Sequence, residues 1–348
     1  VESVAWVSER KDVLYSFFFL SGIISYLKYK NITRRHYLWL IAAFLLFILS
    51  CLSKATAVVF PVILILINFW ISKTEKENSI TKKLLKDVTI KNLLILLPFF
   101  AGSLFFGLMA VHIQSGENFL GILKFIKDPH DVVNIVGPFS TLQRFQIASY
   151  GFFAYIIKFL FPFNLCILYP YPSLPDTGQG PFAILLWIAL TGIILSAILL
   201  FWSLRKTKLY FFGIGFYLIT IILVLQFISV GTFIMAERYT YLPYIGLSFI
   251  VATLIAGAPA KIRKILLSVA GSFIIFLIIL SKQQIDVWFN SKTLWSQVIE
   301  KHPHNELAHS ARGKYYYLLS SYAKNNDERK MYEDKAAIDF KEAIRAGT

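Results

Sequence analysis

The stretch PFAILLWIALTGIILSAILLFWSL, residues 181–204, carries no charged side chain from end to end. A helix needs roughly 20 apolar residues to cross a hydrocarbon core of about 30 Å. Eight further apolar runs lie at 13–27, 37–52, 55–71, 92–112, 147–165, 209–230, 241–257 and 265–281. The chain is 57% hydrophobic and only 16% charged, unlike a typical soluble domain. The sequence therefore predicts an all-α, polytopic membrane helical bundle.

The basic loops reduce this count from nine spans to about eight. Loops rich in Lys and Arg stay in the cytoplasm, and four such loops lie at 28–35, 73–91, 205–208 and 261–264. They share one side only if one run between the second and third loops does not cross. The run 147–165 contains Lys158 and Pro162, which are unfavourable in a lipid-facing span. We therefore predict an outer loop with an interfacial helix over 113–180.

The same alternation predicts what lies on the outer face. Segments 1–12, 51–54, 113–181 and 231–241 fall there, together with a soluble tail that begins at 282. The formal charge of +15 is explained by cytoplasmic loops, so we do not expect nucleic-acid binding. We expect an integral multi-pass protein of a bacterial inner membrane with a periplasmic tail, or of the endoplasmic reticulum with a luminal tail if the source is eukaryotic.

The tail, residues 282–348, matches the 34-residue tetratricopeptide (TPR) pattern at several positions. The matching residues are Pro303, His309, Gly313, Tyr316, Ala336, Phe340 and Ala343. The second-helix positions come later than the pattern requires, which predicts an insertion between Ser320 and Lys335 in the turn between two helices. A truncated pair of repeats cannot bury a continuous core alone, so we expect more repeats after Thr348.

Three polar motifs lie at the predicted outer ends of spans. They are VESVAWVSERKDVL at 1–14, LSKATAVVFP at 52–61 and MAERYTYLP at 235–243. Each has an ordinary explanation: a juxtamembrane cap, a snorkelling lysine or an interfacial aromatic belt with a local ion pair. Their clustered carboxylates and cations also suit a sugar or phosphate substrate at the mouth of a membrane cavity.

Together with the element YPYP at 169–172, these motifs resemble the membrane-plus-TPR O-mannosyltransferase family (TMTC) and its bacterial relatives, over essentially the whole chain. The chain departs from the family at Glu237, where Asp is usual, and at Asn68, where an acidic residue is usual. The resemblance implies a GT-C glycosyltransferase fold and a polyprenyl- or dolichyl-phosphate sugar donor. It also implies transfer, with mannose preferred, to protein Ser/Thr hydroxyls at the outer face.

The resemblance further implies that the first spans and the first outer loop, with its catalytic acidic pair, lie upstream of Val1. We therefore assign no catalytic residue within this stretch. The candidates for donor or substrate binding are Glu2, Glu9, Arg10, Asp12, Lys54, Arg144, Glu237, Arg238 and Tyr239. Arg10 and Arg238 are preferred for the lipid phosphate because carboxylates flank them. For every candidate, an ion pair that braces the outer loops is the alternative role.

We expect no tightly bound cofactor and no metal, because Asp128, His130 and Asp131 lack the spacing of a metal site. The aromatic side chains of the predicted interfacial helix are expected to lie against lipid and to guide the donor's isoprenoid tail; these are Phe152, Phe153, Tyr155, Phe159 and Phe161. The TPR-like tail is expected to hold an acceptor polypeptide.

Two other functions remain open from the sequence. A GT-C transferase can act on a lipid or polysaccharide acceptor, since the shared core does not encode the acceptor. A non-catalytic membrane scaffold can use a TPR array to recruit partners.

Overall fold

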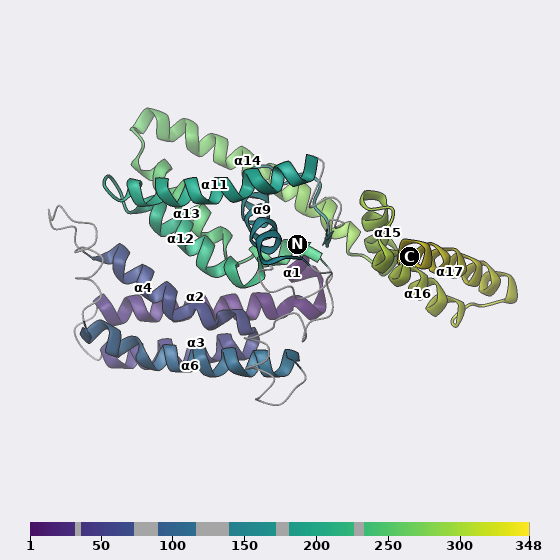
Figure 1. Cartoon of the computed structure of the whole chain (residues 1–348), viewed down its shortest axis with the longest axis horizontal. Coiled ribbons are helices and arrows are strands. Elements are labelled where there is room, and N and C mark those ends of the chain that lie inside the picture. Colours follow the sequence, from purple (N-terminus) through teal and green to yellow (C-terminus); the bar gives the residue numbers. More distant parts are fainter. Residues whose placement is uncertain (32–35, 73–89, 116–138, 172–180, 226–232, 348) are drawn as a thin grey trace.

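Figure 1 shows the computed structural model, which describes residues 1–31, 36–72, 90–115, 139–171, 181–225 and 233–347. The chain is all-α apart from a single two-stranded sheet within these ranges. The helices form two packed groups, and a smaller set of tail helices projects from the end of the bundle where α1 lies.

The first group contains the helices of the N-terminal third. They are α2 (Arg10–Asn31), α3 (His36–Ser53), α4 (Phe60–Ile71), which follows the 3-10 turn η2 (Ala55–Val59), and α6 (Ile90–Ser115). Phe60 lies at the centre of their core. Its ring stacks on Phe47 and Phe99, with centroids at 5.3 Å and 5.9 Å, and meets the edge of Phe19 at 4.9 Å. Such aromatic packing holds the four elements together.

The second group contains α9 (Thr141–Leu160), α11 (Pro181–Ser203), α12 (Leu209–Ile221), its 3-10 extension η3 (Ile222–Val224), and α13 (Tyr244–Gly257). Helices α12 and α13 cross closely at Gly213 and Gly246. A Cβ atom on Gly246 would meet the backbone of Gly213, and would lie 2.9 Å from the backbone nitrogen of Tyr217. Small residues at such crossings allow helix backbones to approach.

Three described helices are long and apolar enough to cross a membrane: α6, α11 and α14 (Ala260–Val287). Shorter apolar helical stretches lie at Tyr37–Ser53, Ala55–Ile71, Leu209–Val224 and Tyr244–Gly257. Each of the eight predicted runs coincides with helical structure in the described residues. Apolar side chains on α11 and α14 are largely exposed, as expected of helices whose outer surface meets lipid. These features are compatible with a membrane protein.

Helix α9 corresponds to the predicted interfacial helix, but its aromatic residues do not all face outward. Phe152 and Tyr155 are buried in the core of the second group, and Phe161 is exposed. The expectation that this whole set lies against lipid was therefore wrong. The apolar side chains of α9 divide between protein contacts and the outer surface, a distinction that hydropathy does not make.

Short elements gather at one end of the bundle. They are α1 (Glu2–Ala5), the 3-10 turn η1 (Val7–Glu9), the antiparallel strands β1 (Tyr169–Pro170) and β2 (Phe233–Met235), and the 3-10 turn η4 (Glu237–Thr240). Beyond α14 follow α15 (Ser291–Lys301), α16 (Glu306–Ser320) and α17 (Asn326–Gly347). Because α14 continues to Val287, the expected boundary at 282 falls inside a helix.

The tail helices α16 and α17 pair closely at Gly313. A Cβ atom there would lie 2.9 Å from the Phe340 ring, so the glycine allows the expected close approach. The predicted insertion between Ser320 and Lys335 contains a turn only at 321–325, because α17 already begins at Asn326. Asn325 caps this helix by accepting from the Glu328 amide at 2.8 Å, which explains why such a polar stretch is helical.

Candidate functional site

The N-terminal segment packs against η4 through a buried ion pair. The Arg238 guanidinium donates through Nη1 to Glu2 Oε1, and the Arg238 backbone amide donates to Glu2 Oε2 at 2.9 Å. The Arg238 Nε atom lies 3.6 Å from Glu9 Oε1. Two carboxylates of the first motif therefore hold one cation of the third, which fixes its position.

Aromatic rings enclose the Arg238 guanidinium. Its carbon lies 5.3 Å, 5.2 Å and 5.0 Å from the ring centroids of Trp6, Phe233 and Tyr239. A guanidinium is weakly hydrated and stacks on rings, so it tolerates this enclosure better than an ammonium would.

Burial and pairing act in opposite directions on this pair. Burial raises the pKa of Glu2 from 4.5 to about 7, against the attraction of the Arg238 guanidinium. Burial acts to lower the pKa of Arg238, but Glu2, Tyr239 and Glu9 together outweigh burial and the pKa of Arg238 rises. Arg238 therefore stays charged, while Glu2 gains or loses its proton near neutral pH.

A second ion pair joins the first motif to the Lys54 turn. The Lys54 ammonium donates to Asp12 Oδ1, and the Ser3 hydroxyl donates to Asp12 Oδ2 at 3.2 Å. The Lys54 ammonium also lies 5.9 Å from the ring of Tyr15 and 5.8 Å from the ring of Tyr239. Tyr239 thus contacts the cations of both pairs, which brings all three motifs together.

A third group surrounds Glu237. The Tyr169 hydroxyl donates to Glu237 Oε1, and the Lys158 ammonium lies 3.9 Å from the same oxygen. Burial raises the pKa of Tyr169, and the Glu237 carboxylate raises it further, so Tyr169 remains a hydrogen-bond donor. Burial lowers the pKa of Lys158, and Glu237 opposes this change.

The backbone before Glu237 is fixed by Tyr155. Its hydroxyl accepts from the Ala236 amide at 2.9 Å and donates to the Ala236 carbonyl at 3.2 Å. The ring is fully buried, so helix α9 determines where η4 begins. Packing in the second helix group therefore positions the Glu237 and Arg238 side chains.

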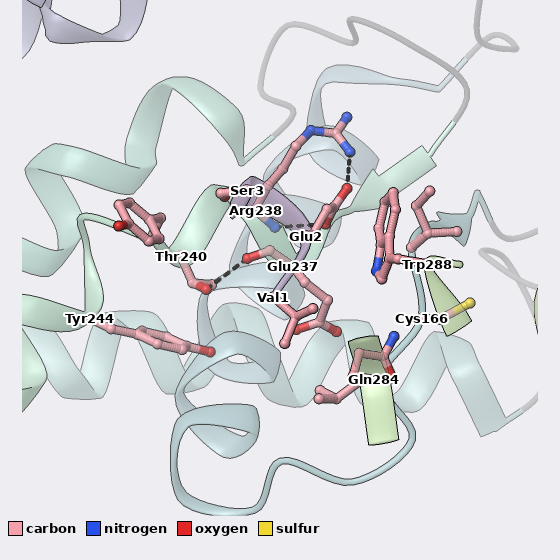
Figure 2. A pocket seen from close by; sticks show the side chains of 13 residues that line it. Val1, Glu2, Ser3, Cys166, Glu237, Arg238, Thr240, Tyr244, Gln284 and Trp288 are labelled. Carbon is pink, nitrogen blue, oxygen red and sulfur yellow. Dashed lines mark hydrogen bonds and ion pairs between the residues drawn. The ribbon is translucent and has the colours of Figure 1, made fainter. Parts of the chain in front are cut away.

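Residues of the first and third motifs line a cavity of about 290 Å³. Figure 2 shows how the side chains surround it. Its polar lining includes Glu2, Glu237, Arg238, Thr240 and Gln284. The Thr240 hydroxyl donates to the Glu237 carbonyl at 2.8 Å, so it is partly engaged by its own turn. A cavity of this size with carboxylates, amide and hydroxyl groups suits a polar ligand such as a sugar.

The tail helices dock beside the cavity. Trp6 packs on Trp288, with ring centroids 5.7 Å apart. The segment from Cys166 to Leu168 is buried together with Val298 of α15 and Ala308 of α16. The tail thus lies at the same end of the bundle as the three motifs, as Figure 1 also shows.

Most of the predicted site residues meet at this end: Glu2, Glu9, Asp12, Lys54, Glu237, Arg238 and Tyr239. Arg10 does not join them; it is exposed at the start of α2 and has no carboxylate partner in the described ranges. Arg144 lies in the first turn of α9, where its Nε donates to the Phe139 carbonyl at 3.3 Å.

Sequence reasoning missed the roles of Tyr169 and Lys158. Tyr169 belongs to the YPYP element, which indicated no specific contact. Lys158 was considered only as unfavourable for a span. A single ammonium in an otherwise apolar run is itself a signal, because such a group needs a partner.

No group of three His, Cys, Asp or Glu side chains in the described part of the chain has metal-binding geometry. Asp128, His130 and Asp131 lie outside those residues.

Comparisons of the chain with family models, with curated proteins and with solved structures find no match. The interpretation of this site therefore depends on its geometry and its sequence motifs.

Proposed function

We propose that the protein is a membrane glycosyltransferase that moves a sugar, with mannose preferred, from a polyprenyl- or dolichyl-phosphate donor to Ser/Thr hydroxyls of a polypeptide. The supporting observation is the convergence of the three polar motifs at one end of the bundle, where residues of the first and third motifs line a cavity. Segments near residues 2, 54 and 238 meet there through Glu2–Arg238, Asp12–Lys54 and the shared contact with Tyr239.

The reaction has defined electrostatic needs. The acceptor hydroxyl oxygen bonds to the anomeric carbon, the bond from that carbon to the phosphate oxygen breaks, and the polyprenyl phosphate leaves with the electron pair. A carboxylate takes the hydroxyl proton, and cations stabilise the departing phosphate. In our proposal Arg238 and Lys54 contribute positive potential, and Glu237 faces the sugar.

The proposed topology has eight spans, formed by α2, α3, α4, α6, α11, α12, α13 and α14. It places the cavity and the tail together on the outer face, in the periplasm of a bacterium or in the lumen of the endoplasmic reticulum. In this proposal α15 to α17 are TPR-type helices that present a polypeptide acceptor beside the cavity.

One observation favours a different function, a non-catalytic scaffold. In the described residues, four carboxylates at this end have a cationic partner: Glu2 and Glu9 with Arg238, Asp12 with Lys54, and Glu237 with Lys158. Mutually paired buried charges also serve as structural braces. A scaffold would need only the docked tail and this brace.

A transfer assay separates the functions. Purified full-length protein in lipid nanodiscs is incubated with polyprenyl-phosphate mannose and a Ser/Thr-rich peptide, and labelled peptide is measured. A lipid and a polysaccharide acceptor are tested in parallel. We expect transfer to the peptide, whereas transfer to either other acceptor identifies the alternative GT-C activity.

The test variant is Glu237→Gln, which removes the charge but keeps an oxygen to accept from Tyr169. We expect transfer to fall at least roughly tenfold, the lower range for losing an electrostatic contact in an active site. The matched control is Glu333→Gln, which changes an exposed Glu that pairs with Arg329 on α17. If the wild type transfers to no acceptor, the enzyme is refuted and the scaffold is favoured; equal transfer by both variants would exclude Glu237 from the site.

A further inference from the structure

A second, mostly apolar groove of about 580 Å³ lies between α9 and α11. Its walls include Phe153, Ala154 and Ile157 from α9, and Ile188 and Gly192 from α11. Ile157 and Ile188 are exposed, so the groove is open along its outer side. An open apolar groove in a membrane-compatible bundle is suited to a hydrocarbon chain.

The groove and the cavity meet along one short segment. Phe163 and Asn164 line the groove, whereas Leu165, Cys166 and Ile167 line the cavity. Asn164 has a φ of 53°, in the left-handed region that Asn tolerates better than most residues. The chain bends at this residue, so consecutive residues of one short segment line first the apolar groove and then the polar cavity.

Lys158 lies at this junction. It is the one charged side chain among the described residues that line the groove. Its ammonium lies 3.9 Å from Oε1 of Glu237 and 3.5 Å from the carbonyl oxygen of Phe163, a groove residue. Glu237 lines the cavity, so this ion pair connects the two compartments.

The order of these features is apolar groove, cation, polar cavity. It matches an amphiphile in which an anionic group lies between a hydrocarbon chain and a polar group. Glu237 keeps the hydrogen bond from Tyr169 when Lys158 turns to another anion, so the carboxylate remains partnered. This sequence of chemistry favours a lipid-phosphate sugar over a bulk phospholipid, whose two chains need apolar surface and whose headgroup needs no sugar cavity.

We propose that the α9–α11 groove holds the hydrocarbon chain of the donor, that Lys158 contacts its phosphate, and that the sugar enters the cavity beside Glu237. This assignment rests on the proposed function. It makes Lys158 a binding residue, distinct from the Arg238 and Lys54 pairs.

Binding of labelled polyprenyl phosphate to the full chain in detergent tests the assignment, with polyprenol of the same length as the uncharged probe. We expect wild type to prefer the phosphate roughly tenfold, as a charge-assisted contact provides. Lys158→Met should abolish this preference and keep polyprenol binding, whereas Lys158→Arg should retain it.

The groove itself is tested by Ala154→Phe, which fills it and should weaken both probes severalfold. Ala197→Phe is the matched control, because Ala197 is exposed on α11 and does not line the groove. Size-exclusion elution and thermal unfolding show that each variant is folded. The assignment is overturned if Lys158→Met keeps the phosphate preference, or if the two Phe variants bind alike.

Competition between labelled polyprenyl phosphate and a bulk phospholipid tests whether the groove is selective. Displacement of the probe by phosphatidylglycerol at equal concentration would make the groove a general phospholipid site and overturn the assignment. Because binding needs no turnover, a protein that binds polyprenyl phosphate as expected but transfers no sugar refutes the proposed function and leaves the groove assignment intact.

Discussion

Replacing Gly246 with Ala should separate helices α12 and α13. The added methyl group would meet the backbone of Gly213 and lie 2.9 Å from the Tyr217 nitrogen. Backbone atoms cannot rotate away as a side chain can, so the helices themselves must shift. Forcing an extra methyl group into a tightly packed site costs about 1–3 kcal/mol.

Gly271→Ala is the matched control for this change. Gly271 also lies inside a helix, α14, but its added methyl group would meet nothing within 4 Å. Both variants gain the helix propensity of Ala over Gly, about 1 kcal/mol, so their difference isolates the packing clash.

We expect Gly246→Ala to unfold at a temperature at least about 1 °C below Gly271→Ala, since one kcal/mol over an unfolding entropy of about 2.1 cal/mol/K per residue gives roughly 1.4 °C for 348 residues. Tryptophan fluorescence of the detergent-solubilised protein during heating measures the unfolding temperatures of both variants. If the unfolding temperature of Gly246→Ala equals or exceeds that of Gly271→Ala, the close crossing at Gly213 and Gly246 is not present in the folded protein.

Three further predictions follow from buried polar contacts. Tyr155→Phe leaves the Ala236 amide without its side-chain partner and should destabilise the protein by about 1–3 kcal/mol, while Tyr322→Phe, at an exposed position, should change stability little in the same melting assay. Because burial raises the pKa of Glu2 from 4.5 to about 7, the folded state binds this proton more tightly than the unfolded state. Thermal stability should therefore rise as pH falls from about 7 to 4.5, by up to about 1.4 kcal/mol per pH unit, and Glu2→Gln should remove this slope. Burial acts to raise the pKa of Asp339, but hydrogen bonds from Arg312 keep it below 3.8, so the amides of α16 and α17 should lose protection against hydrogen exchange, relative to the intrinsic rate at each pH, below about pH 4, and Asp339→Asn should lose that dependence.

Hydropathy predicts the helices of this chain well, because an apolar run of span length has few alternatives to a helix. It does not distinguish a lipid-facing side chain from one in a protein core. Phe152 and Phe161 are equally apolar, yet Phe152 is buried and Phe161 is exposed. The difference arises from the packing of α9 against α11 and α12, which the periodicity of one helix does not reveal.

The candidate site was predictable as a set of charges but not as a set of pairs. Motif order placed Asp12, Lys54 and Arg238 on one face, and the structure brings them to one end of the bundle. The partner of each charge depends on contacts between residues far apart in sequence. The Lys158–Glu237 contact is an example, because neither residue's local sequence indicates the other.

The close approach of the tail helices α16 and α17 was predictable from Gly313, but the length of the turn between them was not. Gly313 has the expected role because only a glycine allows Phe340 to approach so closely. The turn is confined to 321–325, and the polar residues from 326 onward form helix because Asn325 caps it and Arg329 pairs with Glu333 one helical turn away. A hydropathy profile does not reveal helix-stabilising caps and ion pairs of this kind, because it records only that the residues are hydrophilic.

The Glu2–Arg238 pair also sets an order of events during synthesis. Its two residues are 236 positions apart in the chain. At about 5–20 residues per second, a ribosome needs roughly 10–50 seconds to make the intervening segment. During that interval Arg238 has not been made and cannot donate hydrogen bonds to the Glu2 carboxylate. The carboxylate is therefore hydrated or pairs with another cation. The segment around Glu2 is thus made well before η4, and it reaches its final position only after Arg238 has been made.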